Sequence, residues 1–234
     1  MKSIQQVGLI ASALALAAAV VMPAHADHPM SVDDAGTLAK GAAKLEFGWS
    51  RDDSVRGFDA AAGYAPLENL QLDLELAQAR DTDADPTIRA RGVGLVAKWA
   101  PLQSERGLSA GLKLEYGKAW AKASGMPEEH VKAYAATGLA SWAFGSGAAL
   151  HLNLGREWAD LDDDIEAANT WGIGATYPVT ASLEVVAETF GVEEARPDRL
   201  VGLRYEVVEG VKVSAGVGRG NGRSFGNAGI AWEF

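Results

Sequence analysis

The stretch Leu70-Gln71-Leu72-Asp73-Leu74-Glu75-Leu76 alternates apolar and polar residues without interruption. In a helix of 3.6 residues per turn, the polar side chains would be scattered around the circumference, whereas in an extended strand they all lie on one face. The stretch therefore predicts a β-strand with one apolar and one polar face. The same alternation recurs at Leu108–Tyr116, Leu150–Leu154 and Val211–Val217.

Runs of this kind repeat along the whole chain, and we count about twelve of them. Strands of about ten residues that alternate a lipid-facing with a lumen-facing side chain are typical of outer-membrane barrels, which have even strand numbers. We therefore predict an all-β fold, a transmembrane antiparallel up-and-down β-barrel of about twelve strands over residues 41–234. The runs lie near 42–50, 57–65, 70–80, 88–100, 107–117, 131–144, 148–157, 169–178, 181–191, 199–208, 211–218 and 224–234.

The overall composition is compatible with this fold. Hydrophobic residues make up 48% of the 234-residue chain, and the mean hydropathy is near zero, as in a soluble β-sandwich, which is the main alternative. A barrel has the same average because its strands alternate. Cysteine is absent, which excludes thiolate metal sites, cysteine nucleophiles and disulfides. A net charge of -10 argues against nucleic acid as a partner.

The first residues predict an export signal. One lysine precedes an apolar run from Val7 to Met22, Pro23 ends the run, and Ala24-His25-Ala26 is a small-x-small cleavage box. We therefore predict a secretory signal peptide over residues 1–26, cut before Asp27. Residues 27–40 are polar and lack alternation. They are expected either to hang in the periplasm as a leader or to fold into the lumen as a small plug.

The connections between the predicted strands alternate in length. Short connections on one side and longer ones on the other are typical of periplasmic turns and external loops, so both termini are predicted to be periplasmic. Two connections on the external side, Arg51–Arg56 and Arg219–Arg223, are exceptions because they are moderately short. The short connections are Pro66–Asn69, Pro101–Arg106, Gly145–Gly147, Pro178–Thr180 and Val208–Gly210, and the longer ones are Asp81–Thr87, Lys118–His130, Trp158–Ala168 and Val192–Asp198.

Aromatic residues fall near the predicted strand ends, as in the two girdles of a membrane barrel. Tyr134 and Phe58 do not fit the girdles, and the phase of the run 131–144 is open. The residues that face lipid there are either Val131, Ala133, Ala135 and Leu139 or Tyr134, Ala136, Ala140 and Trp142. The external girdle would hold Trp49, Tyr116, Trp158 and Trp171, and the periplasmic one Tyr64, Trp99, Trp142, Tyr177, Tyr205, Trp232 and Phe234.

The chain ends in an apolar-alternating run, Ala228-Gly229-Ile230-Ala231-Trp232-Glu233-Phe234. This ending resembles the C-terminal signal that hands bacterial barrels to their insertion machinery. Phe234 is therefore expected to contact that machinery. Outer-membrane lipid and lipopolysaccharide are the other expected partners. The predicted location is the outer membrane of a Gram-negative cell.

Two motifs resemble a known family. The mature N-terminus reads His28-Pro29-Met30-Ser31-Val32-Asp33-Asp34-Ala35-Gly36-Thr37, and the first predicted turn reads Tyr64-Ala65-Pro66-Leu67-Glu68-Asn69-Leu70-Gln71-Leu72. They resemble the opening of the "MetA-pathway of phenol degradation" barrels, which are also called transporter-like outer-membrane proteins. Val32 and Ala35 stand where that family has threonines. The resemblance covers about residues 28–75 and implies a barrel that passes small, often aromatic, compounds.

Charged residues of both signs occupy the polar face of the predicted strands, where they would line the lumen. They either form a narrow, charge-lined path that selects solutes or pair with one another and close a barrel of this size. Segregated signs would favour the path, and close pairing the closed barrel. The predicted path residues are Lys44, Glu46, Asp73, Glu75, Arg89, Arg91, Lys113, Glu115, His151, Glu184, Arg204 and Lys212, with Asp59, Lys98, Glu157, Glu188 and Glu206 on the same face.

No motif predicts a catalytic centre, a metal site or a cofactor. The acidic clusters at 81–85 and 160–164 lack the glycine and the distal acidic ligand of a calcium loop, and solvated outer loops are favoured. His151 has no sequence-local serine with an acidic orienter, so an inward polar filler is favoured over a hydrolase base. We expect no enzyme. The predicted function is an outer-membrane channel for small solutes, with aromatic or other hydrophobic compounds as candidates. The alternative is a non-conducting barrel whose acidic outer loops bind lipid or partners.

Overall fold

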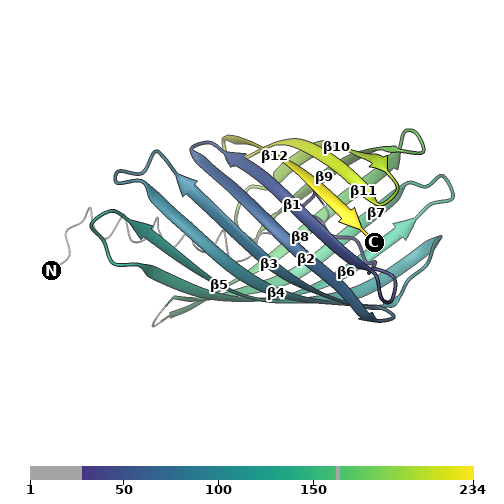
Figure 1. Ribbon diagram of the computed structural model, residues 1–234, viewed down its shortest axis with the longest axis horizontal. Coiled ribbons are helices and arrows are strands. Elements are labelled where there is room, and N and C mark those ends of the chain that lie inside the picture. The colour runs from purple at the N-terminus through teal and green to yellow at the C-terminus, as the bar shows by residue number, and fades with distance from the viewer. Residues whose placement is uncertain (1–27, 162–163) are drawn as a thin grey trace.

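The computed structural model describes residues 28–161 and 164–234, and within them the chain forms a closed antiparallel barrel (Figure 1). Each strand pairs with its neighbours in sequence, and β1 pairs with β12 to close the sheet. This confirms the predicted all-β, twelve-strand, up-and-down barrel. The strands are β1 (Ala43–Asp52), β2 (Val55–Leu67), β3 (Leu70–Asp81), β4 (Ile88–Leu102), β5 (Gly107–Ala123), β6 (Glu129–Ala143), β7 (Ala149–Leu161), β8 (Asp164–Pro178), β9 (Leu183–Val192), β10 (Asp198–Val208), β11 (Val211–Gly220) and β12 (Arg223–Glu233).

The predicted signal peptide, residues 1–26, lies outside the described residues. No helix long and apolar enough to span a membrane occurs in the described part of the chain.

The alternation of β3 shows how the sequence builds the wall. Leu72, Leu74 and Leu76 are 46 to 53% exposed, whereas Gln71 and Glu75 on the opposite face are 6 and 7% exposed. A soluble protein would bury the leucines and expose the carboxylate. Here the apolar face points out of the barrel, where hydrocarbon can cover it, and the polar face points into the lumen.

The two ends of the barrel differ. We call the end that carries Ala43 and Phe234 the proximal end and the opposite end the distal end. At the proximal end, the outward positions carry exposed aromatic rings. This ring set matches the predicted periplasmic girdle and includes Tyr64, Trp99, Trp142, Tyr177, Tyr205 and Trp232.

The structure resolves the phase of β6. Val131, Ala133 and Leu139 are buried inside the barrel, while Tyr134 and Trp142 are exposed on its outer face. The lipid-facing set is therefore the second alternative, which comprises Tyr134, Ala136, Ala140 and Trp142. Tyr134 is the cross-strand partner of Tyr116, and the centroids of the two rings lie 5.2 Å apart.

Two of the longer predicted loops are wrong. Most of Lys118–His130 is strand, since β5 runs to Ala123 and β6 begins at Glu129, and β7 and β8 extend through most of Trp158–Ala168 in the same way. The charges that suggested a loop, such as Lys118 and Lys122, point outward. Small apolar residues on the inner face pack together and hold the extended hairpin, in a cluster of Ile88, Ala90, Ala119, Ala121, Ala123, Val131 and Ala133.

The outward orientation of the apolar face gives a test of membrane insertion. Leu74→Arg places a cation near the middle of the apolar band, and we expect it to lower the free energy of unfolding in lipid vesicles by about 2–4 kcal/mol. Denaturant titration of the refolded protein measures this. Glu105→Arg, at an exposed position in the β4–β5 connection, is the control and should leave stability unchanged. Equal stability of both variants would contradict a lipid-facing β3.

Candidate functional site

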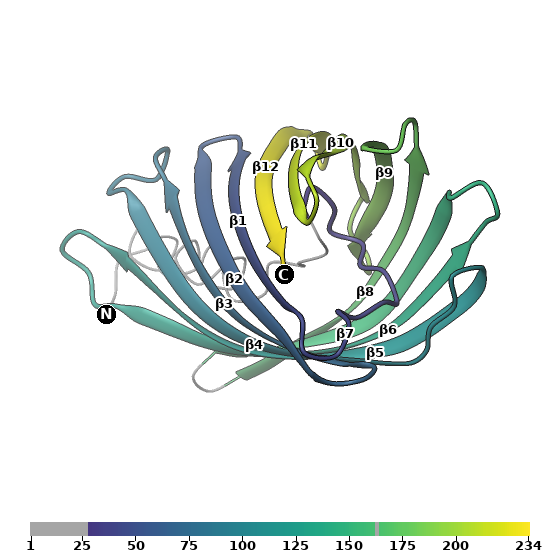
Figure 2. The same ribbon diagram turned by 45° about the vertical axis from the view of Figure 1, so that its right-hand side comes forward.

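Residues 28–42 lie inside the barrel, and we call them the inner segment (Figure 2). The segment has no regular secondary structure, so its backbone amides need partners from the wall. The amides of Ser31 and Val32 donate to the carboxylate of Glu188 on β9, at 2.9 and 2.7 Å. The amide of Asp33 donates to Asn153 Oδ1 on β7, at 2.7 Å.

The same pattern continues around the lumen. The amide of Ala35 donates to Ser141 Oγ on β6 at 2.9 Å, and that of Leu38 donates to Gln71 Oε1 on β3 at 3.0 Å. The inner segment therefore follows the inner wall past several strands. Polar side chains of the wall accept hydrogen bonds from its amides, and Arg204, Asn227 and Asn153 donate to its carbonyls.

Glycines on the wall make room for the apolar part of the inner segment. A Cβ at Gly172 would lie 2.6 Å from Val32 Cγ2, and one at Gly174 would lie 2.6 Å from Met30 Cε. Only residues without a side chain allow this approach. Met30 and Val32 are 5 and 2% exposed and pack with Val186 and Leu200 into a second apolar cluster.

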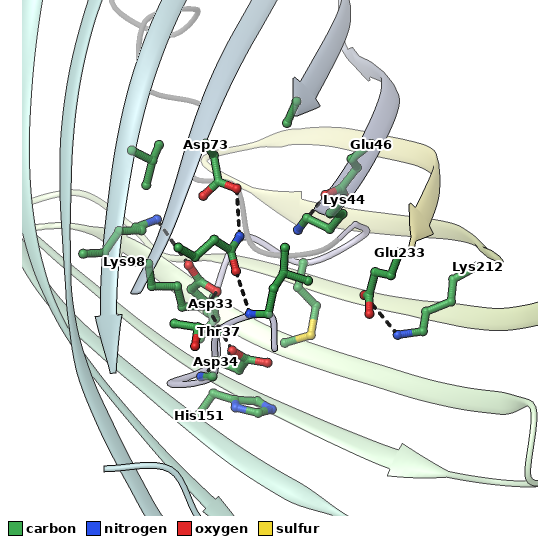
Figure 3. Close-up of a pocket in the computed structure, with 18 of the residues that line it drawn as sticks. Asp33, Asp34, Thr37, Lys44, Glu46, Asp73, Lys98, His151, Lys212 and Glu233 are labelled. Atoms are coloured by element: carbon green, nitrogen blue, oxygen red, sulfur yellow. Dashed lines mark hydrogen bonds and ion pairs between the residues drawn. The ribbon is translucent and has the colours of Figure 1, made fainter. Parts of the chain in front are cut away.

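An ion-pair network holds the middle of the inner segment (Figure 3). Lys98 Nζ on β4 lies 2.8 Å from Asp33 Oδ1 and 3.0 Å from Asp34 Oδ1. Lys113 Nζ on β5 lies 3.6 Å from Asp33 Oδ2 and 3.4 Å from Glu115 Oε2. Asp33 is thus placed between two lysines of the wall.

Three further ion pairs join lumen charges. Lys44 Nζ is 3.2 Å from Glu46, Arg204 Nη1 is 2.6 Å from Glu184, and Lys212 Nζ is 3.4 Å from Glu233. Arg204 also donates to the backbone carbonyl of His28, at 3.1 Å. The signs are therefore intermixed along the wall instead of being segregated on opposite sides.

Two cavities flank the inner segment. The first has a volume of about 540 Å³ and is lined by Asp33, Asp73, His151 and other residues toward the proximal end. The second has a volume of about 320 Å³ and is lined by Glu115, Glu157 and other residues. Val32 of the inner segment and Lys113 line both, so these groups stand between the two cavities.

Carboxylates form a row across the wall. Asp73 is in register with Val96, Val96 with Glu115, Glu115 with Ala135, and Ala135 with Glu157. The intervening side chains are small or apolar. Asp73 faces the first cavity, whereas Glu115 and Glu157 face the second, so both cavities receive negative charge from this row.

Most predicted path residues lie where the sequence placed them, on the inner face around these two cavities: Lys44, Glu46, Asp73, Glu75, Lys113, Glu115, His151, Glu184, Arg204 and Lys212.

Arg89 and Arg91 do not, and the prediction for them was wrong. They share the outer face of β4 with Val93 and Leu95, while Lys98 and Val96 belong to the inner face. The side chain of Arg91 is 70% exposed and lies 3.5 Å from Glu128. Charge alone suggested an inward position, but the two-residue period of a strand places these arginines outside.

The structure also brings Ser141 and His151 together. This contact was not predicted from the sequence, because the two residues lie on different strands. They are cross-strand partners on β6 and β7, and Ser141 Oγ is 2.9 Å from His151 Nδ1. The same hydroxyl accepts the amide of Ala35, so both groups serve to hold the inner segment. Asn153, Ser141 and Gln71 were not singled out as functional from the sequence, because uncharged polar residues on a lumen face carry no distinctive signal.

Comparisons with known proteins support the fold. The model of a family described as "Uncharacterised conserved protein UCP029691" matches residues 13–225. No curated protein matches the chain. The more specific resemblance to phenol-degradation barrels is not confirmed by these matches.

Several solved barrels are similar in structure at low sequence identity. A KdgM porin in complex with disordered oligogalacturonate is 12% identical, with a TM-score of 0.60, over 82% of this chain and 99% of that one. The COG4313 outer membrane channel from Pseudomonas putida F1 is 10% identical, with a TM-score of 0.59, over 86% of this chain and 98% of that one. The transport unit of the autotransporter AIDA-I from Escherichia coli is 14% identical, with a TM-score of 0.55, over 95% of this chain and 98% of that one. At these identities the likeness shows a shared barrel fold.

The Asp33 network predicts how firmly the inner segment is held. Asp33→Asn leaves Lys98 and Lys113 without their shared carboxylate, and we expect it to favour release of the segment by up to about 3 kcal/mol. Because the chain has no cysteine, Val32→Cys supplies a unique buried thiol. Its labelling by a maleimide should be at least about tenfold faster when Asp33→Asn is added.

Asp53→Asn, on an exposed distal turn, is the matched control and should leave the labelling rate unchanged. Equal labelling rates with and without Asp33→Asn would show that the lysine pairs do not hold the segment.

Proposed function

This chain belongs to the family described as Uncharacterised conserved protein UCP029691, and we propose that its barrel is an outer-membrane channel for small solutes whose path is restricted by the inner segment. The observation that carries the proposal is the pair of cavities of about 540 and 320 Å³ on either side of residues 28–42. Cavities of this size accommodate small molecules. The names porin and channel on structurally similar barrels support the same role.

The lumen charges indicate the class of solute. Carboxylates outnumber basic side chains around the first cavity, and Glu75, Glu115 and Glu157 lie close to Lys113, which lines both cavities. A negative interior favours cations and neutral compounds over anions. A polyanion such as the oligogalacturonate bound by the KdgM porin would be repelled here. Small neutral solutes, including aromatic ones, are the best candidates.

A non-conducting barrel is the second candidate, and the close pairing of lumen charges favours it. Lys98, Lys113, Arg204 and Lys212 all engage carboxylates within 3.6 Å. Such pairs hold the interior together and leave the inner segment in place. The two candidates differ in what happens when that segment is released.

The proposed location is the outer membrane, with export by residues 1–26 and insertion through the C-terminal strand. In the folded barrel, the amide and carbonyl of Phe234 pair with Ala43, at 2.9 and 2.8 Å, and complete the seam between β1 and β12. The ring of Trp232 lies 4.4 Å from that of Phe234. Before the seam closes, this edge is open, and we propose that the insertion machinery binds it there.

Planar-bilayer recordings test the channel. We expect the wild-type protein to show small, steady currents, because the inner segment narrows the path. The Asp33→Asn/Asp34→Asn variant, and a protein that lacks residues 28–38, should conduct severalfold more. Heat-modifiable gel migration verifies that each barrel is folded. A folded deletion variant that passes no current would overturn the channel and favour the non-conducting barrel.

Ion selectivity tests the negative interior. In a salt gradient, the reversal potential of the open variant should indicate a preference for potassium over chloride. Glu115→Gln/Glu157→Gln removes two inward carboxylates and should reduce that preference. Glu193→Gln, on an exposed distal connection, changes the charge of the chain without changing the lumen and should leave the potential unaltered. An anion preference in the open variant would contradict the electrostatic argument.

A further inference from the structure

A row of five basic side chains crosses the outer face of five neighbouring strands near the distal end. Arg51 on β1 is in register with Arg56 on β2, Arg56 with Arg80 on β3, Arg80 with Arg89 on β4, and Arg89 with Lys122 on β5. All five are exposed on the outward side of their strands. We call these five residues the basic row.

The basic row is unfavourable without an anion. Side chains directly opposite each other on neighbouring strands lie about 5 Å apart at Cβ, and like charges in this arrangement destabilise a sheet. Arg51 donates to the carbonyl of Asp53. Within residues 28–161 and 164–234, Arg56, Arg80, Arg89 and Lys122 form no ion pair with a carboxylate. Their charge is therefore available to a ligand.

The basic row lies at one boundary of the apolar band. Along β4, ten residues separate Arg89 from Trp99 in the proximal ring. At about 3.3 Å per residue and a strand tilt of about 40°, they span about 25 Å along the barrel axis, which is the usual height of the lipid-facing band. Arg89 therefore lies at the level of lipid head groups on the distal side, and the row crosses this level obliquely because the strands are tilted.

The two boundaries differ in charge. On the distal side, further outward basic residues follow the apolar band, namely Lys118 on β5 and, on other strands, Lys132, Arg156, Arg199 and Arg219. On the proximal side, the outward residues of the described strands are aromatic or aliphatic and none is basic. An anion present at both surfaces would call for basic residues at both boundaries, so this asymmetry indicates an anion found on one side alone.

An apolar groove adjoins the basic row on the same strands. It has a volume of about 650 Å³ and is open on the outer face of the barrel. It is lined by Phe58 and the small Ala60 on β2, by Leu76 on β3, by Val93 on β4 and by Trp120 on β5. A groove of this lining suits a hydrocarbon chain.

Two more cations stand at the margin of the groove. The guanidinium carbon of Arg91, which lines the groove, is 5.6 Å from the centroid of the Trp120 ring, and Lys118 Nζ is 5.2 Å from it. Contacts of this kind hold a cation over an aromatic face. Positive charge and an apolar surface are thus presented together.

We propose that the basic row and this groove form a binding site for the lipid A part of lipopolysaccharide. Lipid A carries phosphate groups on a sugar head and several acyl chains below it. Arginine forks bind phosphate oxygens in pairs, which suits Arg56, Arg80 and Arg89 to the head group. The groove takes an acyl chain. The assignment rests on the proposed outer-membrane location, with the distal end outside, and is independent of whether the barrel conducts.

Binding of purified lipid A to the refolded full-length protein, in mixed detergent micelles, tests the site. Arg80→Gln/Arg89→Gln should weaken binding by about tenfold to thirtyfold, because each basic residue at a lipid surface contributes appreciably. Arg199→Gln/Arg219→Gln removes another directly opposed outward pair, on β10 and β11 away from the groove, and should change binding by less than about threefold. An equal loss of lipid A binding in both variants would show that the outward basic residues of the distal side attract lipid A without a specific site.

Two further arms complete the test. Ala60→Phe should fill the groove and weaken lipid A binding, whereas Ala187→Phe, an outward position on β9, should not. Phosphatidylglycerol and dephosphorylated lipid A should bind at least about tenfold more weakly than lipid A. Equal binding of phosphatidylglycerol, or unchanged binding in a folded Ala60→Phe barrel, would overturn the assignment. Conductance of these variants should match the wild type, which separates this site from the channel.

Discussion

Hydrocarbon offers no hydrogen-bond partner to a backbone amide, and the architecture of this molecule follows from that constraint. Twelve strands pair with their neighbours, and β1 pairs with β12, so that no edge is left in the membrane. Once the sheet is closed, each strand has one face toward lipid and one toward water. The alternation of Leu72, Asp73, Leu74 and Glu75 is the direct consequence. Both the lumen and the outer surface are built on that division.

The inner segment meets the same constraint in a different way. Its central residues have no strand partner, so the amides of Val32, Asp33 and Ala35 bind side chains of the wall instead of another backbone. Wall glycines provide the space, and Lys98 and Lys113 provide the charge that Asp33 requires. This combination makes the segment dependent on a few polar contacts. A segment held in that way can leave without disturbing the hydrogen bonds of the barrel.

The strands were predictable from the sequence because their period of two is a local property. The inner faces of β3, β5 and β7 follow from it directly, and so does most of the cavity lining. Three features did not follow. Arg89 and Arg91 were placed by charge where parity should have decided, and the hairpin of β5 and β6 was hidden by the polar residues on its outer face. Several contacts of residues 28–38 join positions more than a hundred apart, such as Asp33 and Asn153, and no local pattern records them.

The net charge of -10 is an average over two surfaces of opposite character. Carboxylates such as Glu115 and Glu157 face the lumen, while arginines such as Arg80 and Arg89 face outward at the distal boundary. Only the thickness of one sheet separates them, and water in the lumen screens the inner set. The outer set lies beside hydrocarbon, where screening is weaker and an anion is bound more strongly. Bulk charge would suggest that this protein repels anionic lipid, whereas the sorting of charges by strand parity gives its outer face the opposite preference.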